Sequence, residues 1–186
     1  MTKSLSGLIL RVDRFEFVFD DYTLTGEWYK WRTTSPQYQR ARAERIAALP
    51  GVPEGASADD AQKILAVVEK EIRAINAKVM KDTIKSWDAV EEYPATVDQA
   101  TYESLSPRLQ RLYKPQGEIV EGQEPDADLT YELIDPSLAN GPQPVPLTVE
   151  VFEELPALFS RMLGEHFNKQ REEVLNPTPP DSSQSG

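Results

Sequence analysis

Six apolar residues between Ala61 and Val79 recur at spacings that alternate strictly between four and three. This spacing places side chains along one side of an α-helix and does not match the period of two that a strand needs. Ser57 precedes the pattern as an N-cap, and two aspartates follow it where the helix dipole favours carboxylates. The sequence therefore predicts a long helix over 58–85. Its apolar stripe consists of Ala61, Leu65, Val68, Ile72, Ile75 and Val79.

Two kinds of surface are candidates to cover this stripe. In a monomer the stripe packs against other parts of the same chain, whereas in an oligomer it forms a short coiled-coil seam. Because the stripe spans fewer than three heptads, the monomer is favoured. Self-association through the stripe at 61–79 remains the alternative.

The N-terminal region, 1–35, is predicted to contain a β-hairpin. Apolar and polar residues alternate in two runs on either side of the polar pair Asp13–Arg14, and the second run contains three phenylalanines. Alternation with aromatic residues is typical of strands that are buried on one face. We therefore expect one strand on each side of Asp13–Arg14. Tyr29 and Trp31 are expected to pack on this hairpin.

A second helix is expected at about 36–49, where it ends at Pro50–Gly51, so that 36–90 forms a helical core. The following region, 91–146, has a different composition. Over 88–148 the chain carries 12 acidic and 3 basic residues together with 8 of its 15 prolines. This composition predicts an extended, acidic, Pro-rich insertion.

Two short elements are expected within or beside this insertion. Leucines at helical spacing favour a helix over 104–112, and Leu129 to Ile134 is compatible with a strand. The remaining residues from Tyr113 to Pro146 are expected to be extended or mobile.

A C-terminal helical unit is expected over 147–175, with Thr148 as its N-cap. Pro156 either kinks this helix or begins a second one. The unit presents a wide apolar face, which is either the wall of a protein-binding groove or part of the core. This face consists of Phe152, Leu155, Phe159, Met162, Leu163 and Phe167.

The Pro/Ser-rich tail at 176–186 is expected to be disordered. Together the elements predict an α+β, mostly helical fold in one domain.

Few residues in the chain suit catalysis. There is no cysteine and only one histidine, His166, which lies beside the apolar face and is expected to be structural and half-buried. Adjacent glutamates such as Glu91–Glu92 and Glu153–Glu154 point about 100° apart on a helix and usually face solvent. We expect no catalytic residue, no cofactor and no metal site.

Charge and hydropathy restrict the partners. The net charge is −11 and most of it lies in 88–148, which disfavours nucleic acid and anionic membranes as partners. No run approaches the roughly 20 apolar residues of a membrane helix. We expect a cytosolic protein that binds other proteins.

The order of these parts resembles the tail assembly chaperones of long-tailed, siphovirus-type bacteriophages. An aromatic hairpin is followed by helices that end in IKSWDAV at 84–90. A Pro-Thr entry, PVPLT at 144–148, then leads into an acidic helix start, VFEELP at 151–156. In most members of this family the Trp-Asp step runs almost directly into the Pro-Thr entry. Here about 55 residues intervene.

The resemblance implies a non-catalytic chaperone in the host cell cytoplasm that is absent from the mature virion. Its partners would be the long, helical tape measure protein and, secondarily, tail tube subunits. Two alternatives are a structural virion component, such as a minor tail or head–tail connector protein, and an acidic DNA mimic that inhibits a host protein.

Overall fold

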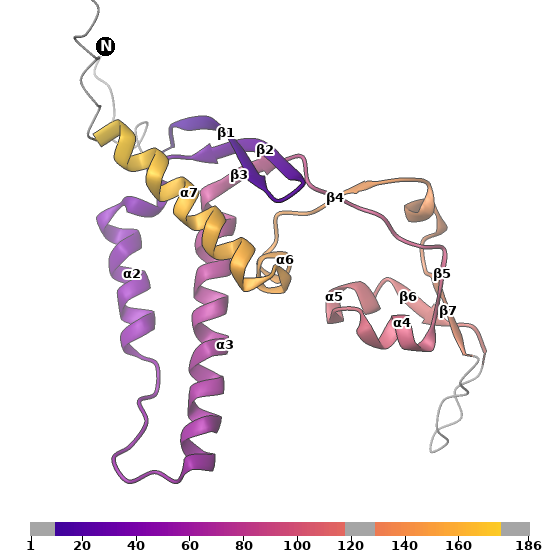
Figure 1. The fold of residues 1–186 in the computed structure, drawn as a ribbon, viewed down its shortest axis with the longest axis horizontal. Coiled ribbons are helices and arrows are strands. Elements are labelled where there is room, and N and C mark those ends of the chain that lie inside the picture. The colour runs from indigo at the N-terminus through magenta and orange to yellow at the C-terminus, as the bar shows by residue number, and fades with distance from the viewer. Residues whose placement is uncertain (1–9, 118–128, 176–186) are drawn as a thin grey trace, which may run out of the picture.

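A computed structural model describes residues 10–117 and 129–175 of the chain (Figure 1). Helix accounts for 51% and strand for 22% of these residues, and an antiparallel hairpin precedes the helices. This confirms the expected α+β, mostly helical fold. The chain forms a body around a three-stranded sheet, two helices that extend from it, and a smaller outer unit. The tail predicted at 176–186 lies outside the described residues.

The sheet of the body contains β1 (Val12–Phe19), β2 (Tyr22–Tyr29) and β3 (Ile84–Trp87) in the antiparallel order β1-β2-β3. The hairpin turns at Asp20–Asp21, between the paired residues Phe19 and Tyr22, and Asp20 has a left-handed φ of 49°. Aspartate tolerates that conformation better than most residues.

The turn predicted at Asp13–Arg14 is wrong, because β1 runs through both residues without a break. The Asp13 carboxylate accepts a hydrogen bond from Lys30 Nζ at 3.0 Å, which satisfies a polar side chain within the strand. Tyr29, expected to pack on the hairpin, is itself part of the sheet and pairs with Val12. Trp31 follows it and is half-buried.

Two helices follow the hairpin, after a short 3₁₀ turn at Arg32–Thr34: α2 (Pro36–Ala47) and α3 (Ala58–Thr83). Each begins at a serine, and the Ser57 hydroxyl accepts the Asp60 N–H as the sequence predicted. The predicted helix at 58–85 is two residues too long. Ile84 is already extended, with ψ at 130°, because the chain enters β3 there and pairs with β2.

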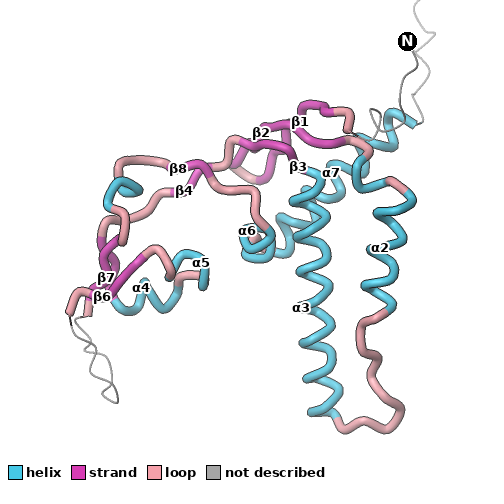
Figure 2. The backbone as a smooth tube through the Cα atoms, turned by 180° about the vertical axis from the view of Figure 1, so that it is seen from behind, coloured by secondary structure: helices cyan, strands magenta, loops and turns pink. Residues whose placement is uncertain are grey.

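The C-terminal unit contains α6 (Val149–Glu154) and α7 (Ala157–Leu175), and Thr148 caps α6 as expected. Pro156 therefore begins a second helix instead of kinking the first. Figures 1 and 2 show α7 lying across the sheet. The main core is made where this helix meets β1, β2 and the end of α3. Its buried residues are Phe15, Phe17, Leu24, Trp28, Ala77, Met80, Ile84, Phe152, Leu163 and Phe167.

The outer unit, 93–139, has a sheet of its own, in the order β5-β7-β6. Its elements are β5 (Thr96–Asp98), α4 (Gln99–Ser104), α5 (Pro107–Gln110), β6 (Tyr113–Pro115), β7 (Thr130–Leu133) and a 3₁₀ turn at Pro136–Ala139. A ribbon of β4 (Val90–Glu91) and β8 (Gln143–Pro144) connects it to the body (Figure 2).

The described part of the insertion is thus folded and not extended, because it buries a small core of its own. Val97, Tyr113, Tyr131 and Leu133 are buried, and the Tyr102 ring stacks on Tyr131 with centroids 3.7 Å apart. The strand expected near 129–134 is confirmed as β7.

The single helix predicted over 104–112 is replaced by two short ones. Leu105 is extended, with ψ at 148°, and Ser106 accepts the Leu109 N–H as a new cap. The residue before Pro107 is disfavoured in the helical region, which ends α4 before α5 begins.

Candidate protein-binding surfaces

The apolar face predicted at the C-terminus is occupied mainly by the protein's own core. Phe152, Leu163 and Phe167 are buried, and Leu155 and Phe159 are partly buried against the same cluster. Only Met162, which is 37% exposed, remains open to solvent. From the sequence this face could be the wall of a groove or part of the core. In the structure it is part of the core.

The packing around this face explains its burial. The Phe167 ring stacks on Trp28 with centroids 4.7 Å apart, and Phe159 meets Phe17 edge to face at 5.5 Å. His166 lies half-buried beside Phe17, and its desolvation lowers the pKa of the imidazole. The position and environment of His166 agree with the structural role expected for it.

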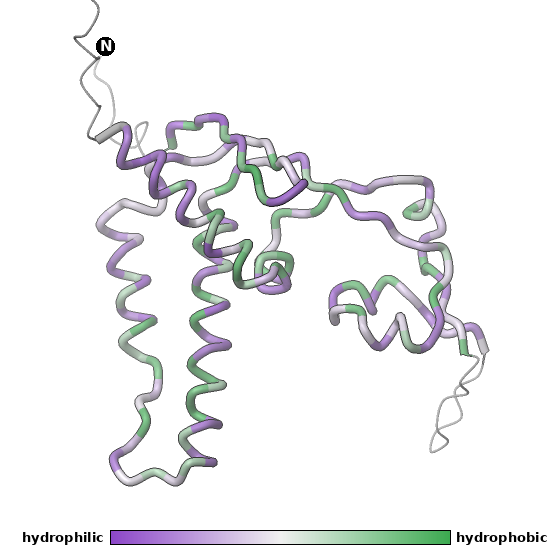
Figure 3. Tube along the Cα trace, in the orientation of Figure 1, coloured by the Kyte–Doolittle hydropathy of each residue, from purple (hydrophilic) through white to green (hydrophobic). Residues whose placement is uncertain are grey.

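The region that lacks such packing is the helical arm, which we define as residues 34–74. It consists of α2, the connecting loop and the first two-thirds of α3, and none of its residues is buried. In Figures 1 and 3 the two helices extend side by side away from the body, and hydrophobic positions recur along α3 to the far end. The arm therefore has no core of its own.

Of the six residues of the apolar stripe on α3, only Ile75 is buried, where the base of α3 faces α2. Ile72 is 41% exposed and Leu65 is 57% exposed. Among the described residues, no other part of the chain covers Leu65 or Ile72, and self-association through 61–79 stays a prediction. The neighbouring helix α2 has too few large apolar side chains to cover them, and its Ile46 is itself 43% exposed.

Two cavities adjoin the base of the arm. One, of about 620 Å³, lies between α2, α3 and the α6–α7 unit, and the other, of about 480 Å³, lies between α2 and α3. They share Tyr38, Arg42 and Val79, and we call the two together the basic seam. Its charged residues are the cations Arg32, Arg42, Arg45, Arg73, Lys78, Lys81, Arg161 and Arg171 and the carboxylates Glu69, Asp82 and Glu165.

A polar contact joins the two helices at this seam. The Tyr38 hydroxyl donates to Asp82 Oδ2 at 3.2 Å, and Lys78 Nζ lies 3.5 Å from the same oxygen. Burial, together with the neighbouring Asp82 carboxylate, raises the pKa of Tyr38 to about 12. Tyr38 thus remains a protonated donor to Asp82, which anchors the start of α2 to the end of α3.

Gly164 opens the wall that α7 contributes to the larger cavity. A Cβ built at this position would meet no atom within 4 Å, although glycine inside a helix costs about 1 kcal/mol relative to alanine. Steric crowding within the chain therefore does not explain the glycine. The sequence carried a signal for this position, since an isolated glycine inside a predicted helix is unfavourable and often has a packing or functional reason.

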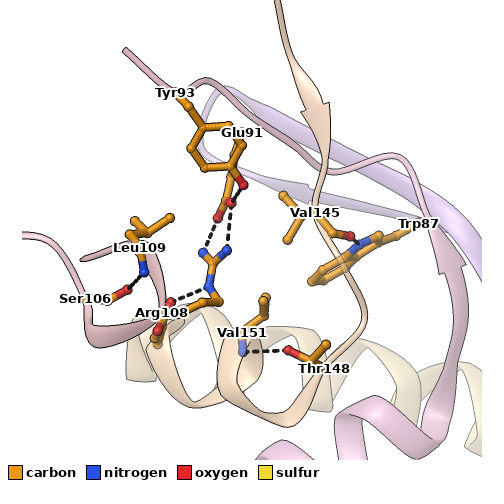
Figure 4. Close-up of polar contacts among 10 residues, drawn as sticks. Trp87, Glu91, Tyr93, Ser106, Arg108, Leu109, Val145, Thr148 and Val151 are labelled. Atoms are coloured by element: carbon orange, nitrogen blue, oxygen red, sulfur yellow. Dashed lines mark hydrogen bonds and ion pairs between the residues drawn. The ribbon is translucent and has the colours of Figure 1, made fainter. Parts of the chain in front are cut away.

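A third cavity lies between the outer unit and the body, and Arg108 of α5 is one of the residues that line it (Figure 4). Its volume is about 380 Å³ and apolar residues such as Trp87 and Phe159 line it. Arg108 donates to both carboxylate oxygens of Glu91, at 2.6 and 3.0 Å, and to Glu154 at 2.9 Å. Glu91 and Glu154 each belong to a glutamate pair that was expected to face solvent. Both instead contact Arg108.

The titration of these groups reflects the ion pairs. Burial tends to raise the pKa of Glu91, but hydrogen bonds from Arg108 and Tyr93 outweigh it and hold the pKa below its usual 4.5. Burial likewise works against the charge of Arg108, and its bonds to Glu91 and Glu154 raise its pKa above the ordinary value. Arg108 therefore holds the outer unit to the body through its ion pairs with Glu91 and Glu154, which we call the Arg108 ion pairs. Sequence reasoning missed them, although Arg108 is one of only three cations in 88–148.

Arg108→Gln is expected to loosen the outer unit and to destabilise the protein by about 1–2 kcal/mol. This is less than the 3–5 kcal/mol typical of a buried ion pair, because solvent reaches these side chains. Amide hydrogen exchange over 93–113 should become faster. Lys114→Gln, which removes the exposed pair with Glu132, is the matched control and should leave exchange unchanged.

The strength of the Arg108 ion pairs should also depend on pH. Because the pKa of Glu91 is depressed in the folded protein, its contribution is complete above 4.5 and is lost as the pH falls through the folded value. Protection of the amides over 93–113, relative to their intrinsic exchange rate at each pH, should therefore fall below pH 4.5 in the wild type. Arg108→Gln should show little of this fall, and an equal fall in both proteins would contradict the role of Arg108.

Within 10–117 and 129–175, no helix is both long and apolar enough to span a bilayer, and no three His, Asp or Glu side chains gather as metal ligands would. Comparisons with protein-family models, with curated proteins and with solved structures found no match to this chain.

Proposed function

We propose that the protein is a non-catalytic tail assembly chaperone of a bacteriophage, and that it binds the tape measure protein through the helical arm. The observation that carries this proposal is the arm itself. No residue from 34 to 74 is classed as buried, and Leu65 and Ile72 of the apolar stripe are exposed.

The physical reason is that two helices alone rarely bury an apolar stripe. A helix with such a stripe packs it against another element, and the usual solution is a third or fourth helix. Here α2 and α3 leave the stripe open, so that a helix from a partner would complete a bundle. The layout resembling tail assembly chaperones suggests the long helical tape measure protein as that partner.

The remaining features are consistent with this function. The acidic 88–148 region would keep a loaded complex apart from other copies by like-charge repulsion, and it disfavours nucleic acid and anionic membranes as partners. Tail tube subunits are the second proposed partner. The chaperone would act in the host cell cytoplasm and be absent from the mature virion.

Leu65→Asp should weaken binding of the tape measure protein at least about tenfold, because it places a charge at a desolvated contact on the arm. The matched control is Val67→Asp. Val67 lies two residues further along the same helix, is exposed to a similar degree, 53% against 57%, and points to the opposite side. Affinities are measured by co-purification and titration with the tape measure protein of the same phage.

Two results would contradict the proposal. Equal affinities of the two variants would show that the stripe is not the contact. Recovery of the protein in purified virions at structural copy number, by mass spectrometry, would favour a structural virion component.

A further inference from the structure

We infer that the partner segment bound at the basic seam is an acidic amphipathic α-helix, whose carboxylates reach Arg42 and Arg161 while its apolar side contacts the floor between α3 and α7. The inference names the chemistry of the partner and rests on the proposed function in taking this region as a helix-binding surface.

The first argument is charge segregation. Eight cations and three carboxylates line the seam, a net of +5 in a chain whose net charge is −11, which leaves −16 for all other residues. Such a separation creates a local positive potential that attracts acidic segments and orients them.

The second argument is that four of the eight cations have no ion pair among the described residues. Two of these four have other partners, because Arg32 lies over the Tyr29 ring and Arg171 donates to the Lys30 carbonyl and to Thr33. Arg73 and Lys78 lie within 4 Å of Glu69 and Asp82, respectively. Among the described residues, Arg42 and Arg161 have no such ion pair. They line the larger cavity from α2 and α7, and a helix placed between them would have a cation on each side.

The third argument is a buried donor at Arg42. Its Nε is shielded from solvent and has no hydrogen-bond partner among the residues described. A buried, unpaired donor is unfavourable, and a donor that belongs to a charged group is best satisfied by a carboxylate. A glutamate or aspartate from the partner would supply the missing acceptor once the Arg42 side chain turns toward the cavity that it lines.

The floor and the size of the seam suit a helix. Ile72, Met80 and Leu155 contribute apolar surface, and Gly164 leaves open space on the opposite wall. The lining residues of α3 run from Glu69 to Thr83, which corresponds to about 21 Å at 1.5 Å per residue, or about four helical turns. An apolar floor of this kind offers nothing to a phosphate backbone, and the surplus negative charge elsewhere repels one.

The test uses two synthetic 20-residue peptides that differ only in charge. Both carry leucines at i, i+3, i+4 and i+7 through their length. One has glutamates at the flanking positions and the other has lysines. Binding to the full chain is measured by fluorescence anisotropy between 50 and 300 mM salt. We expect the acidic peptide to bind at least tenfold more tightly and to weaken as the salt concentration rises.

Paired variants then locate the site. The double change Arg42→Gln and Arg161→Gln should weaken the acidic peptide about tenfold or more. Lys63→Gln with Lys114→Gln makes the same change in net charge outside the seam and should have little effect. Gly164→Leu should also block binding by filling the open space. Thermal unfolding confirms that each variant is folded.

The outcomes separate the inference from the proposed function. Equal binding of both peptides, or tighter binding of a single- or double-stranded oligonucleotide, would overturn the inference. If the tape measure protein binds the Arg42→Gln, Arg161→Gln variant as tightly as the wild type, the inference fails and the proposed function stands. If the tape measure protein does not bind the wild type but the acidic peptide does, the chemistry stands and the named partner is wrong.

Discussion

Phe167→Ala is expected to lower the free energy of unfolding by about 3–5 kcal/mol, the range measured for truncation of large buried aromatic side chains. Phe167 is only 2% exposed, stacks on Trp28 and meets Phe15 edge to face with centroids 5.1 Å apart. Its removal leaves a cavity where α7 contacts the sheet. Denaturant unfolding followed by tryptophan fluorescence measures the loss directly, because Trp28 is one of the ring's neighbours.

Met162→Ala is the control on the same helix. Because this side chain is 37% exposed, its truncation should cost less than about 1 kcal/mol. A loss below about 1 kcal/mol for Phe167→Ala would mean that α7 does not contribute to the core as described. It would also return the Phe152–Phe167 face to consideration as a groove for a partner.

Gly26→Ala should destabilise the protein by about 3 kcal/mol, although alanine is ordinarily a mild substitution. Gly26 lies in the central strand, opposite Phe15 in β1 and Trp87 in β3. An added Cβ would overlap the Ser86 carbonyl oxygen and lie 2.9 Å from both Phe15 Cε1 and Trp87 Cα. Two of these three atoms belong to the backbone of β3, so relief requires the β2–β3 pairing to open.

Gly164→Ala is the matched control and should have the opposite sign. Its Cβ would meet open space, and replacing glycine inside a helix with alanine stabilises by about 0.5–1 kcal/mol. Both variants are measured by thermal unfolding. A neutral Gly26→Ala would show that β3 does not pair closely with β2 at this position.

These core positions restrict where a partner can bind. An apolar stripe on a helix has the same sequence pattern whether it faces the core or a partner, since both need side chains on one side. The faces around Phe167 and Leu65 both showed such a pattern, but only the second is open to solvent. A substitution at Phe167 would reduce binding only by unfolding the body, whereas Leu65→Asp leaves the core untouched.

The elements that were predicted correctly depend on neighbours close in the chain. Ser57 and Thr148 cap helices by bonding N–H groups three residues away, and the spacing of the α3 stripe reflects the turn of the helix alone. The start of α3 was predicted at its observed residue, whereas its end was missed by two residues because a strand pairing with distant β2 determines it.

The features of the binding surfaces that were missed depend on contacts between distant residues. Arg108 is 46 residues from Glu154 and Trp28 is 139 residues from Phe167. No local sequence pattern therefore predicts either contact. The same holds for the seam, where Arg42 and Arg161 face one cavity from α2 and α7. The sequence by itself determined the start and the stripe of α3, the caps at Ser57 and Thr148 and the position of the acidic charge, because short-range hydrogen bonds and periodicity specify them. Only the tertiary structure decided which apolar faces are covered, because that depends on which distant segments meet.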